Sequence, residues 1–145
     1  MNREIRRLYF AYGSNLNVAQ MLDRCPTAKA VTRHTMVDWK LIFRGYADIV
    51  PAVGNVVEGG LYEVGPKDVA ALDRYEGVSA GFYSQVAFYL PNGSPAFFYR
   101  MNDGEIYPPD KKYVKIITAG FVDWNIPINS LEAAVTDALK SMANA

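Results

Sequence analysis

A glutamate followed by a glycine, Glu76-Gly77, is the first candidate for chemistry in this sequence. The preceding segment begins at Pro66 and has the pattern of a helix that ends near Gly77. The helix dipole disfavours a carboxylate at that end, and an inward turn toward Phe82 or Tyr83 would raise its pKa by desolvation. A raised pKa suits general acid–base catalysis near neutral pH. The alternative interpretation is a solvated glutamate at a helix end.

The loop Tyr12-Gly13-Ser14-Asn15-Leu16 is the second candidate. It follows the apolar run 8–12, which is typical of a buried strand, and it precedes a short helix that Asn17 can cap. Successive backbone amides in such a loop converge, so they can hold a carboxylate or a phosphate without a basic side chain. The loop carries neither nucleotide-binding fingerprint. An ordinary strand–turn–helix connection, with Ser14 or Asn15 as the cap, is the alternative.

The other candidates are weaker. His34 is the only histidine and lies in a strand-like stretch, which favours a structural or surface role. With Cys25 as the single cysteine, neither a Cys–His pair nor a zinc site is expected. Asp73 is expected to point outward and to pair with Arg74 or Lys67.

These residues need elements that position them, and the pattern predicts an α+β fold. Strands are expected at 28–34, 37–44, 47–53, 56–64, 82–90 and 95–101, with Gly59-Gly60 marking a bulge or a close approach. Helices are expected from Asn17 to about Arg24, from Pro66 to Gly77, over 111–122 after Asp110, and from Ser130, which would be a cap. Helices do not alternate with strands, so a mainly antiparallel, barrel-like sheet is favoured over a doubly wound one.

The bulk properties indicate one domain, residues 1–145. The 15 basic and 15 acidic residues cancel, which argues against a nucleic-acid partner. A single cysteine, no apolar leader at the N-terminus and no long apolar run lead us to expect a cytoplasmic protein without a membrane span. The sequence does not determine the oligomeric state, and a homodimer is a possible assembly.

Three stretches, in order, resemble the γ-glutamylcyclotransferase-like family (the AIG2-like superfamily). They are 8–16, which contains the Tyr12–Leu16 loop, 72–83, which contains Glu76 and Tyr83, and 107–120, which contains Tyr113, together with 125–127. The resemblance covers most of the chain. It implies an α+β fold with a central, antiparallel-rich β-barrel and flanking helices.

The resemblance also implies an enzyme that turns a γ-glutamyl amino acid or amine into 5-oxoproline and a free amine. Glu76 would be the general acid and base, and the loop amides of Gly13, Ser14, Asn15 and Leu16 would hold a small anionic substrate. Tyr12 begins that loop, Tyr83 would hydrogen-bond Glu76 or the substrate, and Tyr113 would shape the pocket. No metal or cofactor is required.

Two other functions stay open at this stage. One is a relative that processes a different small amide, and the other is a binding domain of the same fold without activity. The chain is shorter than the better-characterised members between Arg44 and Val56, and its last helix ends soon after Met142. These departures leave the leaving group undetermined.

Overall fold

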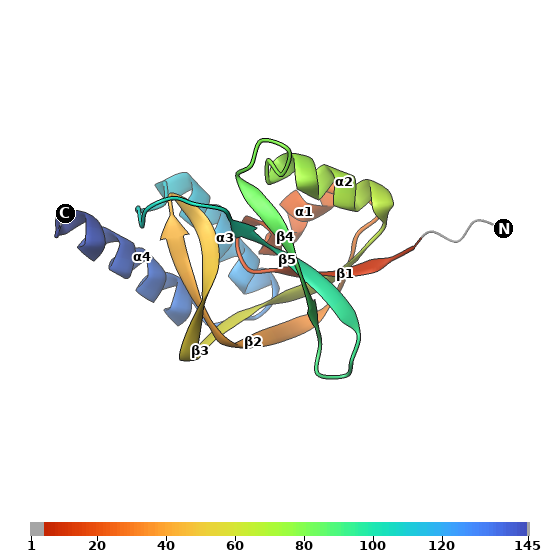
Figure 1. Cartoon of the computed structure of the whole chain (residues 1–145), viewed down its shortest axis with the longest axis horizontal. Coiled ribbons are helices and arrows are strands. Elements are labelled where there is room, and N and C mark those ends of the chain that lie inside the picture. The colour runs from red at the N-terminus through yellow and green to blue at the C-terminus, as the bar shows by residue number, and fades with distance from the viewer. Residues whose placement is uncertain (1–4, 145) are drawn as a thin grey trace.

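The computed structural model describes residues 5–144, which form a five-stranded mixed sheet with four α-helices and one short 3-10 turn (Figure 1). The expected α+β class is therefore confirmed. In chain order the elements are β1 (Arg7–Ala11), η1 (Ser14–Leu16), α1 (Val18–Arg24), β2 (Lys29–Arg44), β3 (Tyr46–Val64), α2 (Pro66–Tyr75), β4 (Tyr83–Tyr89), β5 (Pro95–Met101), α3 (Lys111–Asp123) and α4 (Asn129–Ala143).

The strands are ordered β2-β3-β1-β5-β4. Three of the four pairings are antiparallel, and β1 pairs with β5 in parallel. Within the described residues β2 and β4 are the two edges and the sheet is not closed, so the barrel implied by the resemblance is not confirmed. The parallel pair lies at the centre because β1 enters between two hairpins that are distant in sequence.

Strands β2 and β3 are longer than the sequence pattern indicates. The four predicted segments between 28 and 64 merge into one continuous hairpin, whose register shifts between Val37 and Trp39. At this irregularity Asp38 and Gly54 both adopt a positive φ, and the Asp38 carboxylate accepts a hydrogen bond from the Gly54 amide at 3.0 Å. The break expected between 53 and 56 is thus a bulge that lets the hairpin bend without ending it, whereas the break between 44 and 47 is the turn of the hairpin.

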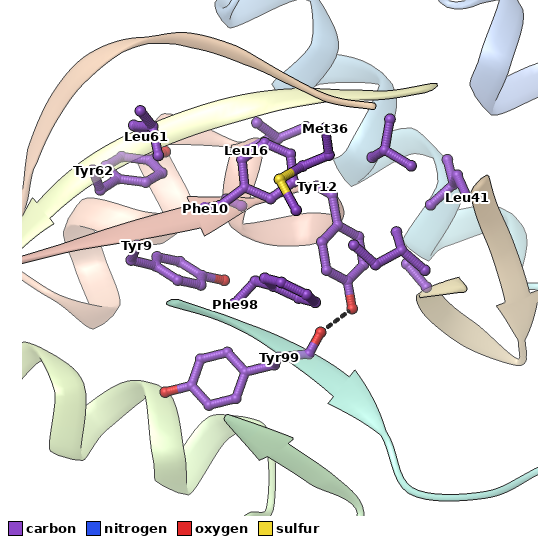
Figure 2. Close-up of a cluster of buried hydrophobic side chains, with 14 of the residues drawn as sticks. Tyr9, Phe10, Tyr12, Leu16, Met36, Leu41, Leu61, Tyr62, Phe98 and Tyr99 are labelled. Carbon is purple, nitrogen blue, oxygen red and sulfur yellow. Dashed lines mark hydrogen bonds between the residues drawn. The ribbon is translucent and has the colours of Figure 1, made fainter. Parts of the chain in front are cut away.

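The core lies on both sides of β1, whose central residues are fully covered. Tyr9 and Phe10 are buried, and the Tyr12 ring, just past the strand, reaches the backbone of β5, where its hydroxyl donates to the Tyr99 carbonyl at 2.6 Å (Figure 2). Gly59 explains the close contact with β3, because a Cβ at that position would lie 2.2 Å from the Ala11 carbonyl oxygen. The close approach expected at Gly59-Gly60 is therefore present.

Three of the four predicted helix starts agree with the structure. Asn17 caps α1 by accepting from the Gln20 amide, α2 starts at Pro66 after a Gly65 N-cap, and Asp110 caps α3 by accepting from the Lys112 amide. The prediction for α4 is wrong, because this helix starts at Asn129 and Ser130 lies inside it. In Figure 1, α1 and α2 lie side by side, while α4 packs beside β2.

Candidate active site

The C-terminal end of α2 places Glu76. The helix stops there because Gly77 takes the left-handed conformation, with φ at 64°. The Gly77 amide donates to the Arg74 carbonyl at 3.2 Å and the Val78 amide donates to the Asp73 carbonyl at 3.0 Å. These two bonds form a Schellman motif, with Glu76 as the C-cap residue. The glutamate thus sits at a fixed point, on the turn that redirects the chain toward β4.

The loop 12–16 is held against α3 by a close backbone contact. A Cβ at Gly120 would lie 2.6 Å from the Asn17 amide nitrogen, so only glycine permits this approach. The indole of Trp124 donates to the Leu16 carbonyl at 2.8 Å. The Leu16 amide is used inside the turn, where it donates to the Gly13 carbonyl at 3.0 Å. The first amides of a helical turn have no acceptor within that turn, which leaves those of Ser14 and Asn15 free of bonds inside it.

The Asn15 side chain connects the loop to Glu76. Its Nδ2 donates to the Tyr9 hydroxyl at 2.9 Å and, at a longer 3.4 Å, to Oε1 of Glu76. Its Oδ1 accepts from the guanidinium of Arg24. Its backbone carbonyl accepts from the Tyr62 hydroxyl at 2.7 Å. The asparagine is 2% exposed, and both ends of its side-chain amide have partners that hold it in place.

A cavity of about 520 Å³ opens between the loop and Glu76. The backbone loop forms one wall through Gly13, Ser14 and Asn15, and the α2 terminus forms another through Glu76 and Gly77. The remaining surface is largely aromatic, and seven of the ten tyrosines line it: Tyr9, Tyr12, Tyr46, Tyr75, Tyr83, Tyr99 and Tyr113. The cavity therefore combines an apolar lining with a few convergent polar groups, as small-molecule sites do.

Two of these tyrosines are anchored on one residue of β3, Ala47. The Tyr83 hydroxyl donates to the Ala47 carbonyl at 2.7 Å, and the Tyr113 hydroxyl accepts from the Ala47 amide at 3.1 Å. Gly13 belongs to the same contact, because a Cβ there would lie 3.0 Å from the Ala47 side chain. The start of β3 therefore brings together the loop, β4 and α3.

The adjacent residue, Asp48, fixes this part of β3. Its side chain is 0% exposed and accepts from Nε of Arg44 and from the Met101 amide, both at 3.0 Å. The charge is thus compensated by a guanidinium and a backbone dipole. Asp48 joins β3 to the end of β5, next to the position where Ala47 receives the two tyrosines.

Burial is the main influence on the ionisation of Glu76. It raises the pKa of the carboxyl from its ordinary 4.5 to about 7, although Arg24 acts in the opposite direction. The surrounding tyrosines respond to the same environment, since burial and the nearby Glu76 both raise the pKa of Tyr9 and Tyr83. Near neutral pH the cavity thus contains a carboxyl that can take up or release a proton and phenols that remain protonated.

Comparisons with known proteins point to one family. A family model described as gamma-glutamyl cyclotransferase, AIG2-like, matches residues 9–123. Gamma-glutamylcyclotransferase of Bos taurus is 30% identical over 137 residues, which cover 83% of this chain and 73% of the bovine protein. For the Homo sapiens protein of the same name the identity is 30% over 141 residues, with 86% and 75% covered. A solved structure of a gamma-glutamyl cyclotransferase superposes with a TM-score of 0.79 at 28% identity, over 90% of this chain and 86% of that one.

The chain belongs to the gamma-glutamyl cyclotransferase, AIG2-like family. The resemblance found in the sequence is confirmed, and with it the expectation of an enzyme of the cyclotransferase type. Among residues 5–144, no helix has both the length and the apolar character needed to cross a membrane. The same residues contain no cluster of three or more His, Cys, Asp or Glu side chains arranged to hold a metal ion.

Most of the predicted site residues of this family member meet at the cavity. Glu76, the loop residues Tyr12 to Asn15, Tyr83 and Tyr113 all line it. Leu16 is not among the lining residues and is fully buried. Ser14 and Asn15 form the 3-10 turn and do not cap α1, which is the role of Asn17. His34 does not line the cavity either, and its ring packs against Phe10 and Phe88.

The expectation for Asp73 is wrong. Its carboxylate accepts from the Tyr99 hydroxyl at 2.6 Å and from Nε2 of Gln85 at 2.8 Å, so it turns inward and joins α2 to the sheet. Helical spacing could have predicted this inward orientation, because residues three apart lie on the same face of a helix and Asp73 precedes Glu76 by three. Tyr9, Tyr46 and Tyr99 were also missed, since nothing in the sequence distinguishes them from the other tyrosines.

Proposed function

We propose that this protein is a γ-glutamyl cyclotransferase in which Glu76 carries protons and the loop 12–15 holds the substrate. In this reaction the α-amine of a γ-glutamyl amino acid or amine attacks its own γ-carbonyl carbon. The bond to the leaving nitrogen breaks, and the products are 5-oxoproline and the free amine. The observation that carries the proposal is a buried carboxyl with a pKa of about 7 that faces a backbone turn across one cavity.

The loop is proposed to bind the α-carboxylate of the glutamyl group. The Ser14 and Asn15 amides begin a helical turn and lie at the cavity wall, which suits an anion. Holding the carboxylate there would keep the flexible γ-glutamyl chain folded for ring closure. Attack within one molecule needs little else, because proximity alone can lower the barrier by about 7–11 kcal/mol. Tyr83 and Tyr113 would shape the surface against which the folded chain rests.

Glu76 is proposed to take a proton from the substrate ammonium and to return one to the leaving nitrogen. A carboxyl with a pKa of about 7 is divided between its two forms near neutral pH, so it can serve in both steps. Neither step requires a metal or a cofactor.

The test uses a panel of γ-glutamyl amino acids and γ-glutamyl amines, with 5-oxoproline detected by mass spectrometry. Wild-type protein should form 5-oxoproline from at least one of them. Glu76→Gln keeps the shape and removes the titrating group, so kcat/KM should fall about 10²–10⁴-fold. Glu63→Gln is the matched control, because Glu63 pairs with Arg6 and is not among the cavity-lining residues.

Two results would contradict the proposal. Equal product from wild type and Glu76→Gln would show that the proton carrier is another group. Absence of product from every compound in the panel would show that the substrate class is wrong, or that this family member binds without reacting.

A further inference from the structure

Arg24, the last residue of α1, does not line the cavity, yet it contacts one residue from each of two cavity walls. Its guanidinium stacks on the Tyr75 ring, with its central carbon 3.4 Å from the ring centroid, and it donates to Oδ1 of Asn15. The Tyr75 hydroxyl in turn lies 3.1 Å from Oγ of Ser14. The arginine thus connects the end of α2 with the loop 12–15.

The bond to Asn15 determines which way its amide group faces. An arginine side chain only donates hydrogen bonds, so the Asn15 atom that faces it must be the oxygen. The amino group Nδ2 is then directed to the opposite side, toward the Tyr9 hydroxyl at 2.9 Å and Glu76 Oε1 at 3.4 Å. Tyr9 cannot make this choice, because a phenol can donate or accept.

The other orientation of the amide would present Oδ1 to the Glu76 carboxyl. An oxygen there repels a carboxylate and accepts a hydrogen bond from a protonated carboxyl, so it would favour the acid form. The orientation that Arg24 imposes favours the ionised form. Ionised Glu76 is the species that must accept the ammonium proton in the reaction proposed above.

We propose that Arg24 is a positioning residue that fixes the Asn15 amide with its NH2 group toward Glu76 and places a positive charge behind it. This inference rests on the proposed role of Glu76 only for its kinetic consequence. The contact itself, and its effect on the carboxyl, are properties of the protein without substrate.

Most of the other ionisable groups around Glu76 carry no charge near pH 7. They come from β1, the loop, β4, β5 and α3 and are phenols whose raised pKa values keep them neutral: Tyr9, Tyr12, Tyr83, Tyr99 and Tyr113. On α2 itself, Arg74 also lines the cavity and is exposed. Arg24 is the charged side chain that lowers the pKa of Glu76.

The first experiment measures Glu76 directly, by ¹³C NMR titration of protein labelled at the glutamate carboxyl carbon and assigned with Glu76→Gln. In Arg24→Met the titration midpoint should rise by roughly one pH unit, because the charge and the fixed amide are both lost. Arg24→Lys keeps a charged donor, so its Glu76 midpoint should lie close to that of wild type. Arg33→Met is the matched control, since Arg33 pairs with Glu58 and is not in the cavity lining.

The second experiment follows kcat/KM against pH for a substrate found with the γ-glutamyl panel. The kcat/KM of Arg24→Met should be about fivefold below that of wild type at pH 7. It should approach the wild-type value as the pH rises, because a higher pH restores the ionised glutamate. A role in folding alone would lower activity equally at every pH. If Arg24→Met does not fold, Arg24→Gln gives the same comparison with a neutral polar side chain.

An unchanged Glu76 midpoint in a folded Arg24→Met or Arg24→Gln protein would overturn the inference. A shifted midpoint in a protein that makes no 5-oxoproline would instead leave the inference standing and reject the proposed function. The role of Arg24 and the proposed function can therefore be rejected independently of each other.

Discussion

Two carboxylates, Asp48 close to the cavity and Glu76 in its lining, have opposite surroundings. Asp48 at the start of β3 is fully enclosed, and its two oxygens accept from Arg44 and from the Met101 amide at 3.0 Å. Glu76 at the end of α2 receives one long hydrogen bond, 3.4 Å from Asn15. The charge of Asp48 is compensated by its partners, whereas Glu76 is desolvated and has little to compensate its charge.

The difference shows that burial by itself does not give a carboxylate a chemical role. Asp48 is the more deeply buried of the two, yet its partners hold β3 against the end of β2 and the end of β5. Glu76 faces open volume, and its weak partners leave the proton exchangeable near neutral pH. The two carboxylates are therefore distinguished by what surrounds their oxygens.

The largest expected effect on stability is its dependence on pH through Glu76. Folded Glu76 keeps its proton up to a pH of about 7, while the unfolded chain releases it near 4.5. Between these values the folded state binds more protons, so the free energy of unfolding falls as the pH rises, by up to about 3 kcal/mol. Urea unfolding of wild type and Glu76→Gln at pH 5 and pH 8 would measure this.

Glu76→Gln should remove that dependence and be more stable than wild type at pH 8. Contributions from other groups cancel when the two proteins are compared at each pH. Parallel pH dependences for the two proteins would show that Glu76 is solvated, and the contrast with Asp48 would then disappear.

Asp48→Asn should lower the free energy of unfolding, which is opposite to the effect of Glu76→Gln, and the change should be somewhat smaller. It leaves Arg44 without a carboxylate, and removing one partner of a buried pair costs about 3–5 kcal/mol when both charges are enclosed. The Arg44 side chain is 22% exposed, so water offsets part of this and a loss of about 2 kcal/mol at pH 7 is expected. Urea unfolding at constant pH is the measurement.

Glu58→Gln is the control for Asp48→Asn. It breaks a surface ion pair with Arg33 at 3.5 Å and should change the free energy of unfolding by less than about 1 kcal/mol. Similar losses in the free energy of unfolding for Asp48→Asn and Glu58→Gln would show that the burial of Asp48 adds nothing to the stability its ion pair provides.

The contrast also explains what the sequence can predict here. Glu76 was found because its signals are local: a proline at the start of its helix and a glycine at the end, confirmed by φ 64° at Gly77. The caps Asn17 and Asp110 were found in the same way. The start of α4 was missed because Ile128 caps it without a side-chain hydrogen bond, so the sequence carries no polar signal there.

Asp48 and Ala47 have no such local signal. Their importance comes from partners distant in sequence, such as Tyr83, Met101 and Tyr113, and only the fold brings these residues together. Arg24 belongs to the same group, since its contact with Tyr75 joins two helices that β2 and β3 separate in the chain. A single sequence could therefore locate the candidate glutamate and the loop but not the residues that support them.

The smallest predicted effect concerns the hydrogen bond by which β4 contacts the Asp48 region. Tyr83→Phe removes the hydroxyl that donates to the Ala47 carbonyl at 2.7 Å and leaves that buried acceptor unpaired, which costs about 1 kcal/mol or slightly more. Tyr46→Phe also removes a hydroxyl from a cavity-lining residue, but Tyr46 is 60% exposed, so the free energy of unfolding of this variant should be nearly unchanged. Urea unfolding of both variants at one pH isolates the buried bond. If Tyr83→Phe is as stable as Tyr46→Phe, the Ala47 carbonyl is reached by water, and the start of β3 is less enclosed than the burial of Asp48 implies.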